Sequence, residues 1–166
     1  MHYYDLYESH QGRMLLVAND VGLSGAYFDG QKYFPRVDPD WRRDARHAPL
    51  RQAERELAEY FGGERKRFES PLAPEGTAFQ QSVWKAISTV GFGETITYSE
   101  LARRAGFPGS ARAAGAATGR NPISIIVPCH RIVGSNGSLT GYAGGLDRKR
   151  ALLALESGIP ELLAAA

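Results

Sequence analysis

The sequence predicts an α+β protein in two parts: a small antiparallel sheet with one helix, then a mostly helical domain with a helix-turn-helix. Short β-rich segments separated by turn residues come first, an amphipathic helix follows, and from residue 77 onward helix signals replace strand signals. Two prolines and a glycine in residues 70–76 mark a linker. We therefore expect one domain over residues 1–75 and a second over residues 76–166.

Composition limits the kinds of protein this chain can be. With one cysteine and four scattered histidines, an internal disulfide is excluded and a structural zinc site is disfavoured. No segment approaches the roughly 20 apolar residues of a membrane span, so we expect no membrane partner. We expect a reduced protein of the cytoplasm, or of the nucleus in a larger cell, with no metal and no cofactor. Residues 77–166 hold nine Lys and Arg against five Asp and Glu. This balance suits an anionic partner such as nucleic acid, and a solvated basic surface is the alternative.

In the first part, residues 3–9, 13–18 and 23–28 are expected to form a meander of three strands. Residues 31–49 contain three prolines and are expected to be a loop. From about residue 48, apolar side chains recur at spacings of three and four, which predicts a helix that ends at Gly62 and Gly63. The apolar positions are Leu50, Ala53, Leu57, Tyr60 and Phe61. That stripe needs a sheet to pack against.

In the second part, two capping boxes predict two helix starts. Thr77 and Gln80 open a core helix, and Thr97 and Glu100 open a short helix over residues 98–105. Residues 110–119 favour a further helix whose only long side chain is that of Arg112. Two short helices joined by a Gly/Pro turn suggest a helix-turn-helix that reads DNA shape and backbone rather than base edges. The alternative is two helices packed tightly through alanines inside an ordinary domain.

The lone cysteine follows an apolar run. Residues 123–127 are expected to form a buried strand, and Pro128 must turn the chain and present Cys129. A thiol with a pKa of roughly 8.5 needs a base or a positive field to act as a nucleophile. His130 and Arg131 offer both, and a water on a tight turn could join the two side chains. The alternative is a buried structural cysteine beside a hydrogen-bonded histidine.

Two glycine-rich segments and a helix complete the chain. Residues 134–138 and 140–145 are expected to be loops whose glycines let the backbone approach a flat ligand. Residues 146–155 are expected to form a helix with residues 148–150 exposed. Glu156, near the end of that helix, could orient His130, although a surface glutamate is the more common case.

These motifs resemble the O6-alkylguanine-DNA alkyltransferases, a family of suicidal DNA-repair proteins. The resemblance is dense in residues 79–84, 93–102, 109–115, 126–132 and 141–146, and its most specific part is Pro128-Cys129-His130-Arg131 with Asn121-Pro122 upstream and Tyr142-x-Gly-Gly downstream. The first part resembles the family only in length and in its sheet-and-helix character. The resemblance implies a ribonuclease-H-like first domain and a winged-helix-like second domain.

It also implies a mechanism. The protein would bind alkylated double-stranded DNA through the minor groove, flip the damaged nucleotide, and move the alkyl group from O6-alkylguanine, or from O4-alkylthymine, to Cys129 once. His130 would deprotonate Cys129 through a water and Glu156 would fix its tautomer; Tyr98 would donate to the departing base, and Asn121 would brace the nucleophile. Arg112 would fill the gap in the stack. The other expected DNA contacts are Tyr98, Ser110, Ala111, Ala113, Ala114, Gly115, Arg120 and Ser135. The expected pocket residues are Thr118, Ser124, Ile132, Tyr142, Ala143 and Gly144.

The sequence departs from some relatives in two places. Residue 143 is alanine where some carry serine, so only its backbone N–H could serve the guanine oxygen. With no cysteine before residue 129, the zinc site of some relatives should be absent. We expect a monomer that can cluster on DNA. A lesion sensor without chemistry and an ordinary cysteine hydrolase are the alternative functions.

Overall fold

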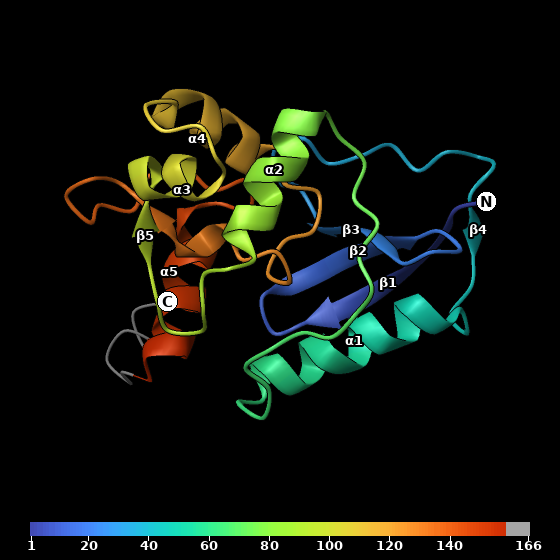
Figure 1. Ribbon diagram of the computed structural model, residues 1–166. Helices are drawn as coiled ribbons and strands as arrows, with labels where there is room; N and C mark the ends of the chain where they lie inside the picture. The colour runs from blue at the N-terminus through green and yellow to red at the C-terminus, as the bar shows by residue number, and fades with distance from the viewer. Residues whose placement is uncertain (159–166) are drawn as a thin grey trace. The chain divides into compact units, whose positions relative to one another are not determined.

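The computed structural model describes residues 1–158, which fall into two compact units (Figure 1). The first unit comprises residues 1–75 together with residues 122–126, and the second comprises residues 76–121 and the chain from residue 127. The α+β class is confirmed. The short segment 122–126 departs from the expected boundary because it bonds to a strand of the first unit: Ala26 N–H donates to Pro122 O and Ser124 N–H donates to Ala26 O.

The first unit contains a sheet of four strands in the order β3-β2-β1-β4. The antiparallel meander is confirmed as β1 (Tyr3–Ser9), β2 (Gly12–Ala18) and β3 (Leu23–Phe28). The fourth strand, β4 (Arg42–Arg43), pairs in parallel with β1. The expectation that residues 31–49 are only loop was therefore wrong at β4, a two-residue strand that depends on a distant partner and has no sequence periodicity.

Helix α1 (Ala48–Phe61) follows the predicted pattern. Leu50, Ala53, Leu57 and Tyr60 are buried, and Phe61 is only half-buried. Gly63 has a φ of 77°, a left-handed conformation that favours glycine directly after a helix. The helix thus ends where the Gly62-Gly63 pair predicts.

The expected linker is fixed to the first unit through most of its length. Leu23 N–H donates to Pro71 O at 2.8 Å, and Ala73 N–H donates to Leu23 O at 2.7 Å. The buried carboxylate of Glu56 accepts from Ser70 Oγ at 2.7 Å and from Ser70 N–H at 3.0 Å. The prolines therefore mark a segment that pairs with the edge of β3 before the chain enters the second unit.

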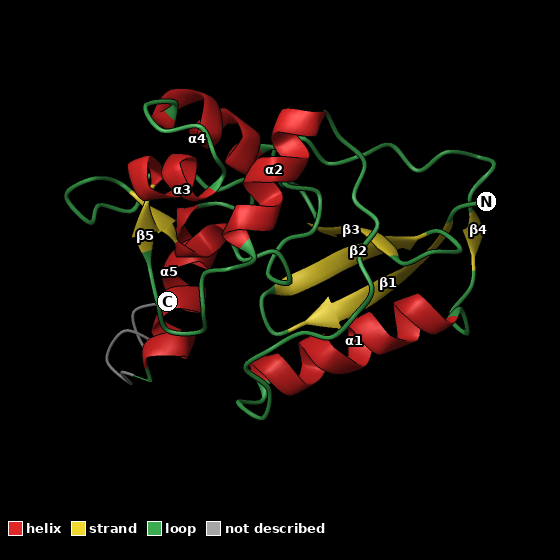
Figure 2. Cartoon of the chain, in the orientation of Figure 1, coloured by secondary structure: helices red, strands yellow, loops and turns green. Residues whose placement is uncertain are grey.

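The second unit is mostly helical, as Figure 2 shows. Its elements are α2 (Ala78–Ile87), β5 (Ile96–Thr97), α3 (Tyr98–Arg104), α4 (Ala111–Gly119), η1 (Cys129–Arg131), β6 (Ile132–Val133) and α5 (Leu146–Ser157). Strands β5 and β6 pair in parallel. Across residues 1–158, no helix combines the length and the apolar character needed to cross a membrane.

The two capping boxes have different outcomes. Thr77 Oγ1 accepts from Gln80 N–H and Gln80 Oε1 accepts from Thr77 N–H, so the first box is confirmed. At α3, Thr97 Oγ1 accepts from Glu100 N–H, but the Glu100 carboxylate turns to Arg103 and Arg104. Only half of the second box forms, because two guanidinium groups compete for the same carboxylate.

The predicted strand over residues 123–127 does not form. The run is buried as expected, but it turns twice. Ile126 N–H donates to Ser124 O across Ile125, whose φ is 72°, and Cys129 N–H donates to Val127 O across Pro128. Both are γ-turns, and φ near +72° is strained for a β-branched residue. Apolar runs of this length identify burial but not conformation.

Candidate active site

Cys129 begins the single turn η1 and is 5 % exposed. Asn121 and Cys129 are tied together, because Val127 O accepts from Asn121 Nδ2 at 2.9 Å and from Cys129 N–H at 2.8 Å. A hydrogen bond from Asn121 to the cysteine side chain also acts to lower the pKa of Cys129. Asn121 follows α4 closely, so these hydrogen bonds link the end of that helix to Cys129.

His130, Arg131 and Glu156 form a buried cluster. The ring of His130 is fully buried, and its Nε2 lies 2.6 Å from Glu156 Oε2. Arg131 grips the same carboxylate with two donors, Nε to Oε1 at 2.8 Å and Nη2 to Oε2 at 3.0 Å, and a third donor, Nη1, reaches Val90 O at 2.7 Å. Fork-shaped pairing of this kind holds a carboxylate in one orientation and keeps it ionised.

The carboxylate of Glu156 fixes the tautomer of His130. An ionised carboxylate only accepts hydrogen bonds, so Nε2 must carry the proton and Nδ1 is left as an acceptor. Nδ1 is buried and has no protein partner within residues 1–158. Burial lowers the pKa of His130, and this outweighs the opposing effect of Glu156. The imidazole is therefore neutral, and its Nδ1 is a basic nitrogen to which no described group donates a hydrogen bond.

The thiol itself rests protonated. Burial raises the pKa of Cys129 to about 11, and the opposing effects of Asn121 and Lys149 are smaller. At neutral pH only a small fraction would be thiolate, which is the nucleophilic form. A base must therefore accept the thiol proton as the sulfur reacts.

Lys149 corrects a sequence-based expectation, since residues 148–150 were expected to be exposed. It is fully buried on α5, and its Nζ donates to Ile132 O at 2.6 Å and to Thr140 O at 2.8 Å. Burial lowers the pKa of Lys149 to about 8, and the charge on Cys129 acts in the opposite direction. Its position inside a run of basic residues gave no sign of this burial. It brings a positive charge close enough to Cys129 to lower the pKa of the thiol.

Tyr98 lies between α4 and the glycine-rich loop. Its ring is 3.6 Å from the point where a Cβ on Gly115 would lie, and its hydroxyl donates to Thr140 O at 3.4 Å. Burial is the main cause that raises the pKa of Tyr98, and charge on Cys129 also raises it. The hydroxyl is therefore a neutral donor that responds to charge at the cysteine.

The expected DNA-contacting residues of α3 and α4 divide by exposure. Arg112, Ala113 and Arg120 are exposed, and Ser110, Ala111 and Gly115 are half-buried. Ala114 is fully buried, so its side chain belongs to the core of the second unit and cannot contact DNA. On the buried side of α4, Ala117 O accepts from Trp84 Nε1 at 2.8 Å. The small helix thus packs through one alanine face and exposes another.

The expected pocket residues lie in several segments. Tyr142 places its ring edge-on to His130, 6.5 Å between centroids, and Ala143 and Gly144 follow it. Cys129 O accepts from Ile132 N–H, and Ile132 O accepts from Lys149 Nζ. Each of these carbonyl oxygens keeps one further lone pair that could accept a hydrogen bond from a ligand. Of the other expected pocket residues, Thr118 is buried and its hydroxyl donates to Ala114 O, and Ser124 is buried in the first unit. Ser135, an expected DNA contact, is exposed in the loop of residues 134–138.

The raised pKa of Cys129 predicts a pH dependence. The second-order rate of alkylation by iodoacetamide should rise roughly tenfold per pH unit from pH 7 to about pH 10, because the thiolate fraction grows by that factor below the pKa. Free cysteine, with a pKa of roughly 8.5, should level off earlier in the same buffers. A plateau for Cys129 below pH 8 would show that the resting group is already a thiolate.

No group of three or more His, Cys, Asp or Glu side chains within residues 1–158 is arranged to hold a metal ion. The site is built from a thiol, an imidazole, a carboxylate and two buried cations. Such a set can activate sulfur for attack on an electrophilic carbon and can stabilise negative charge nearby.

Comparison with known proteins agrees with these features. Residues 2–74 match the ribonuclease-like domain and residues 78–158 the DNA-binding domain of 6-O-methylguanine DNA methyltransferase. A methylated-DNA–protein-cysteine methyltransferase of Methanosarcina acetivorans is 49% identical over 154 residues, 93% of this chain and 97% of that protein. One of Haemophilus influenzae is 43% identical over 93% of this chain and 86% of that protein.

Solved structures give the same result. The crystal structure of Mycobacterium tuberculosis OGT in complex with DNA matches with a TM-score of 0.86 and 43% identity, and the match covers 94% of this chain and 93% of that one. Family profiles, relatives and fold coincide over nearly the whole length. The chain belongs to the 6-O-methylguanine DNA methyltransferase family.

Proposed function

We propose that this protein repairs alkylated double-stranded DNA by moving the alkyl group from O6 of guanine, and from O4 of thymine, onto Cys129, once per molecule. The observation that carries the proposal is the buried cluster of His130, Glu156 and Arg131, in which His130 follows the protonated Cys129 in the single turn η1. It supplies a neutral base with a fixed tautomer next to the one residue in the chain that can accept an alkyl group as a thioether.

In the proposed reaction, Sγ of Cys129 attacks the alkyl carbon as the bond from that carbon to O6 breaks. The thiol proton passes through a water to Nδ1 of His130, and the electron pair of the broken bond stays on the guanine. The Tyr98 hydroxyl donates a proton to the departing base, which leaves as neutral guanine, and the proton held by His130 then returns to Tyr98 through solvent. A thioether is stable to hydrolysis, so the protein is consumed.

Arg131 and Lys149 have positioning roles in this scheme that the sequence analysis did not assign. Arg131 keeps Glu156 ionised and oriented, and thereby keeps the proton of His130 on Nε2. Lys149 fixes the carbonyls of Ile132 and Thr140 and lowers the cost of a transient thiolate at Cys129.

DNA binding is assigned to the exposed face of α4. That face offers Arg112, Ala113 and Ala116 with little bulk, and the buried face is fixed by Trp84. A helix with small side chains can enter the narrow minor groove, and an inserted long side chain can replace a base that has left the stack. The relative from Mycobacterium tuberculosis was crystallised in complex with DNA, which supports this assignment.

The test of the reaction is its stoichiometry. Incubation with excess duplex DNA that contains labelled O6-methylguanine should transfer one methyl group per chain, on the peptide that contains Cys129, and then stop. Intact-mass spectrometry and peptide mapping measure both points. Continued turnover, or label on another residue, would contradict the proposal.

Replacement of Arg112 by alanine should separate flipping from chemistry. We expect repair in duplex DNA to slow by roughly tenfold to a hundredfold, because the extruded state loses a stabilising contact of a few kcal/mol or less. Reaction with the free base should hardly change. The matched control is Arg51→Ala, an exposed arginine on α1 of the first unit. Equal losses of Arg112→Ala on both substrates would contradict the stack-filling role.

A further inference from the structure

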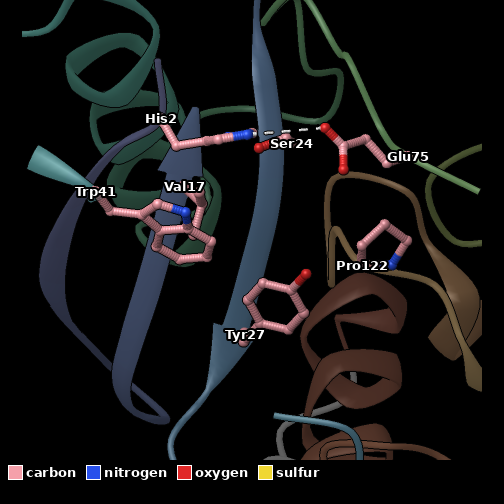
Figure 3. Close-up of a pocket in the computed structure, with 7 residues that line it drawn as sticks. All are labelled: His2, Val17, Ser24, Tyr27, Trp41, Glu75 and Pro122. Carbon is pink, nitrogen blue, oxygen red and sulfur yellow. Dashed lines mark ion pairs between the residues drawn. The ribbon is translucent and has the colours of Figure 1, made fainter. Parts of the chain in front are cut away.

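A cavity of about 170 Å³ opens on the first unit and is built from that unit alone (Figure 3). None of its lining residues takes part in the cysteine chemistry. Six of them carry the argument below: His2, Val17, Tyr27, Trp41, Glu75 and Pro122.

Backbone hydrogen bonds to the sheet fix three walls of the cavity. Arg42 N–H donates to His2 O at 2.9 Å, which places Trp41 beside His2 with ring centroids 5.7 Å apart. The bond from Ala73 to Leu23 brings Glu75 to the start of β3, and the bond from Ala26 places Pro122. The cavity is therefore formed before any ligand arrives.

The fourth wall depends on a glycine. A Cβ on Gly25 would lie 2.4 Å from Cε2 of Tyr27, so the tyrosine ring occupies the space that a side chain at residue 25 would fill. Figure 3 shows the indole of Trp41 and the ring of Tyr27 on different sides of the opening, with Val17 on the strand behind. Two aromatic rings thus border one small space.

The charges that border the cavity belong to Glu75 and, when it is protonated, to His2, whose Nε2 lies 4.0 Å from Glu75 Oε1 (Figure 3). Glu75 is its only carboxylate, and among the described residues that line it there is neither lysine nor arginine. Burial raises the pKa of Tyr27, and the charge of Glu75 raises it further, so the negative potential of the carboxylate extends to the tyrosine ring. His2 contributes a buried Nδ1 that has no protein partner within residues 1–158.

We propose that this cavity binds a small organic ammonium ion, with the cationic group between the rings of Trp41 and Tyr27 and facing the carboxylate of Glu75. Aromatic faces attract alkylammonium groups, and a carboxylate at the rim adds Coulomb attraction that an uncharged molecule of the same shape does not receive.

The two tryptophans of the chain provide the readout. In an NMR titration of the ¹⁵N-labelled full chain, choline should shift the indole N–H signal of Trp41 and saturate. The signal of Trp84, buried in the second unit, should stay in place. The uncharged isostere 3,3-dimethylbutan-1-ol should cause no saturating shift, and sodium chloride at matched ionic strength should cause none.

Two variants test the carboxylate. Glu75→Gln should weaken choline binding by about two- to fivefold, whereas Glu8→Gln, an equal charge change at an exposed site on β1, should leave it unchanged. Equal shifts with the alcohol would show an apolar cavity without preference for cations. An absence of saturation, equal losses in the two variants, or parallel movement of both tryptophan signals would also overturn the proposal.

Discussion

Replacement of Cys129 by serine is expected to abolish alkyl transfer and to leave binding of alkylated DNA intact. A hydroxyl is far less acidic than a thiol and its oxygen is a poorer nucleophile, so the rate should fall by roughly a thousandfold or more. The side chain keeps its size within one atom and can still accept from Asn121, so we expect a stability loss of only about 1 kcal/mol.

The sequence makes this experiment unambiguous, because the chain holds no second cysteine that could accept the alkyl group. Single-turnover reaction with labelled duplex DNA measures the transfer, and a binding titration with the same DNA measures recognition. Glu8→Gln, an exposed change on β1 of the first unit, serves as the folded control. Label found on the Cys129→Ser protein would refute the assignment of the acceptor, and unchanged repair would refute the reaction.

Local patterns predicted much of the fold. The apolar spacing in α1, the capping box at Thr77 and the glycines after α1 all act over a few residues, and each is found where the sequence places it. Strand β4 was missed because its parallel partner lies about forty residues earlier, and a two-residue strand carries no period of its own. The predicted strand before Pro128 failed for a different reason, since burial alone does not distinguish an extended run from two γ-turns.

The sequence predicted those site residues whose type is needed for the chemistry. It did not predict a residue whose burial contradicts its usual place on the surface. The adjacency of Cys129 and His130 and the nearby Glu156 predicted the residues now proposed as nucleophile, base and orienting group, and the structure places His130 against Glu156. Lys149 stands between two arginines in a run that is typical of a solvated face. It is nevertheless fully buried, and its Nζ donates to three backbone carbonyls. Only the tertiary structure brings those carbonyls to one point, so no local pattern could reveal its position.

The second large effect is expected for Glu156→Gln. In the unmodified protein, Glu156 Oε2 accepts from His130 and from Arg131, and Glu156 Oε1 accepts from Arg131. The glutamine has the same shape, but one of its two terminal atoms is an amide nitrogen, which donates instead of accepting. If the amide faces His130, Nε2 must accept, the ring proton moves to Nδ1, and the base is lost on the side of the thiol. We expect the single-turnover rate at pH 7 to fall by roughly a hundredfold to a thousandfold.

The pH profile distinguishes this role from a merely structural one. Cys129 has a pKa of about 11, so a rising pH supplies thiolate directly and makes the base less necessary. The deficit of Glu156→Gln relative to the unmodified protein should therefore shrink between pH 7 and pH 9.5, while that of the neighbouring control Ser157→Ala stays near zero. Loss of the buried ion pair also destabilises the fold, by about 3–5 kcal/mol, and thermal unfolding of each variant measures this separately. A deficit that is constant with pH would mean that Glu156 supports the fold alone and does not act through His130.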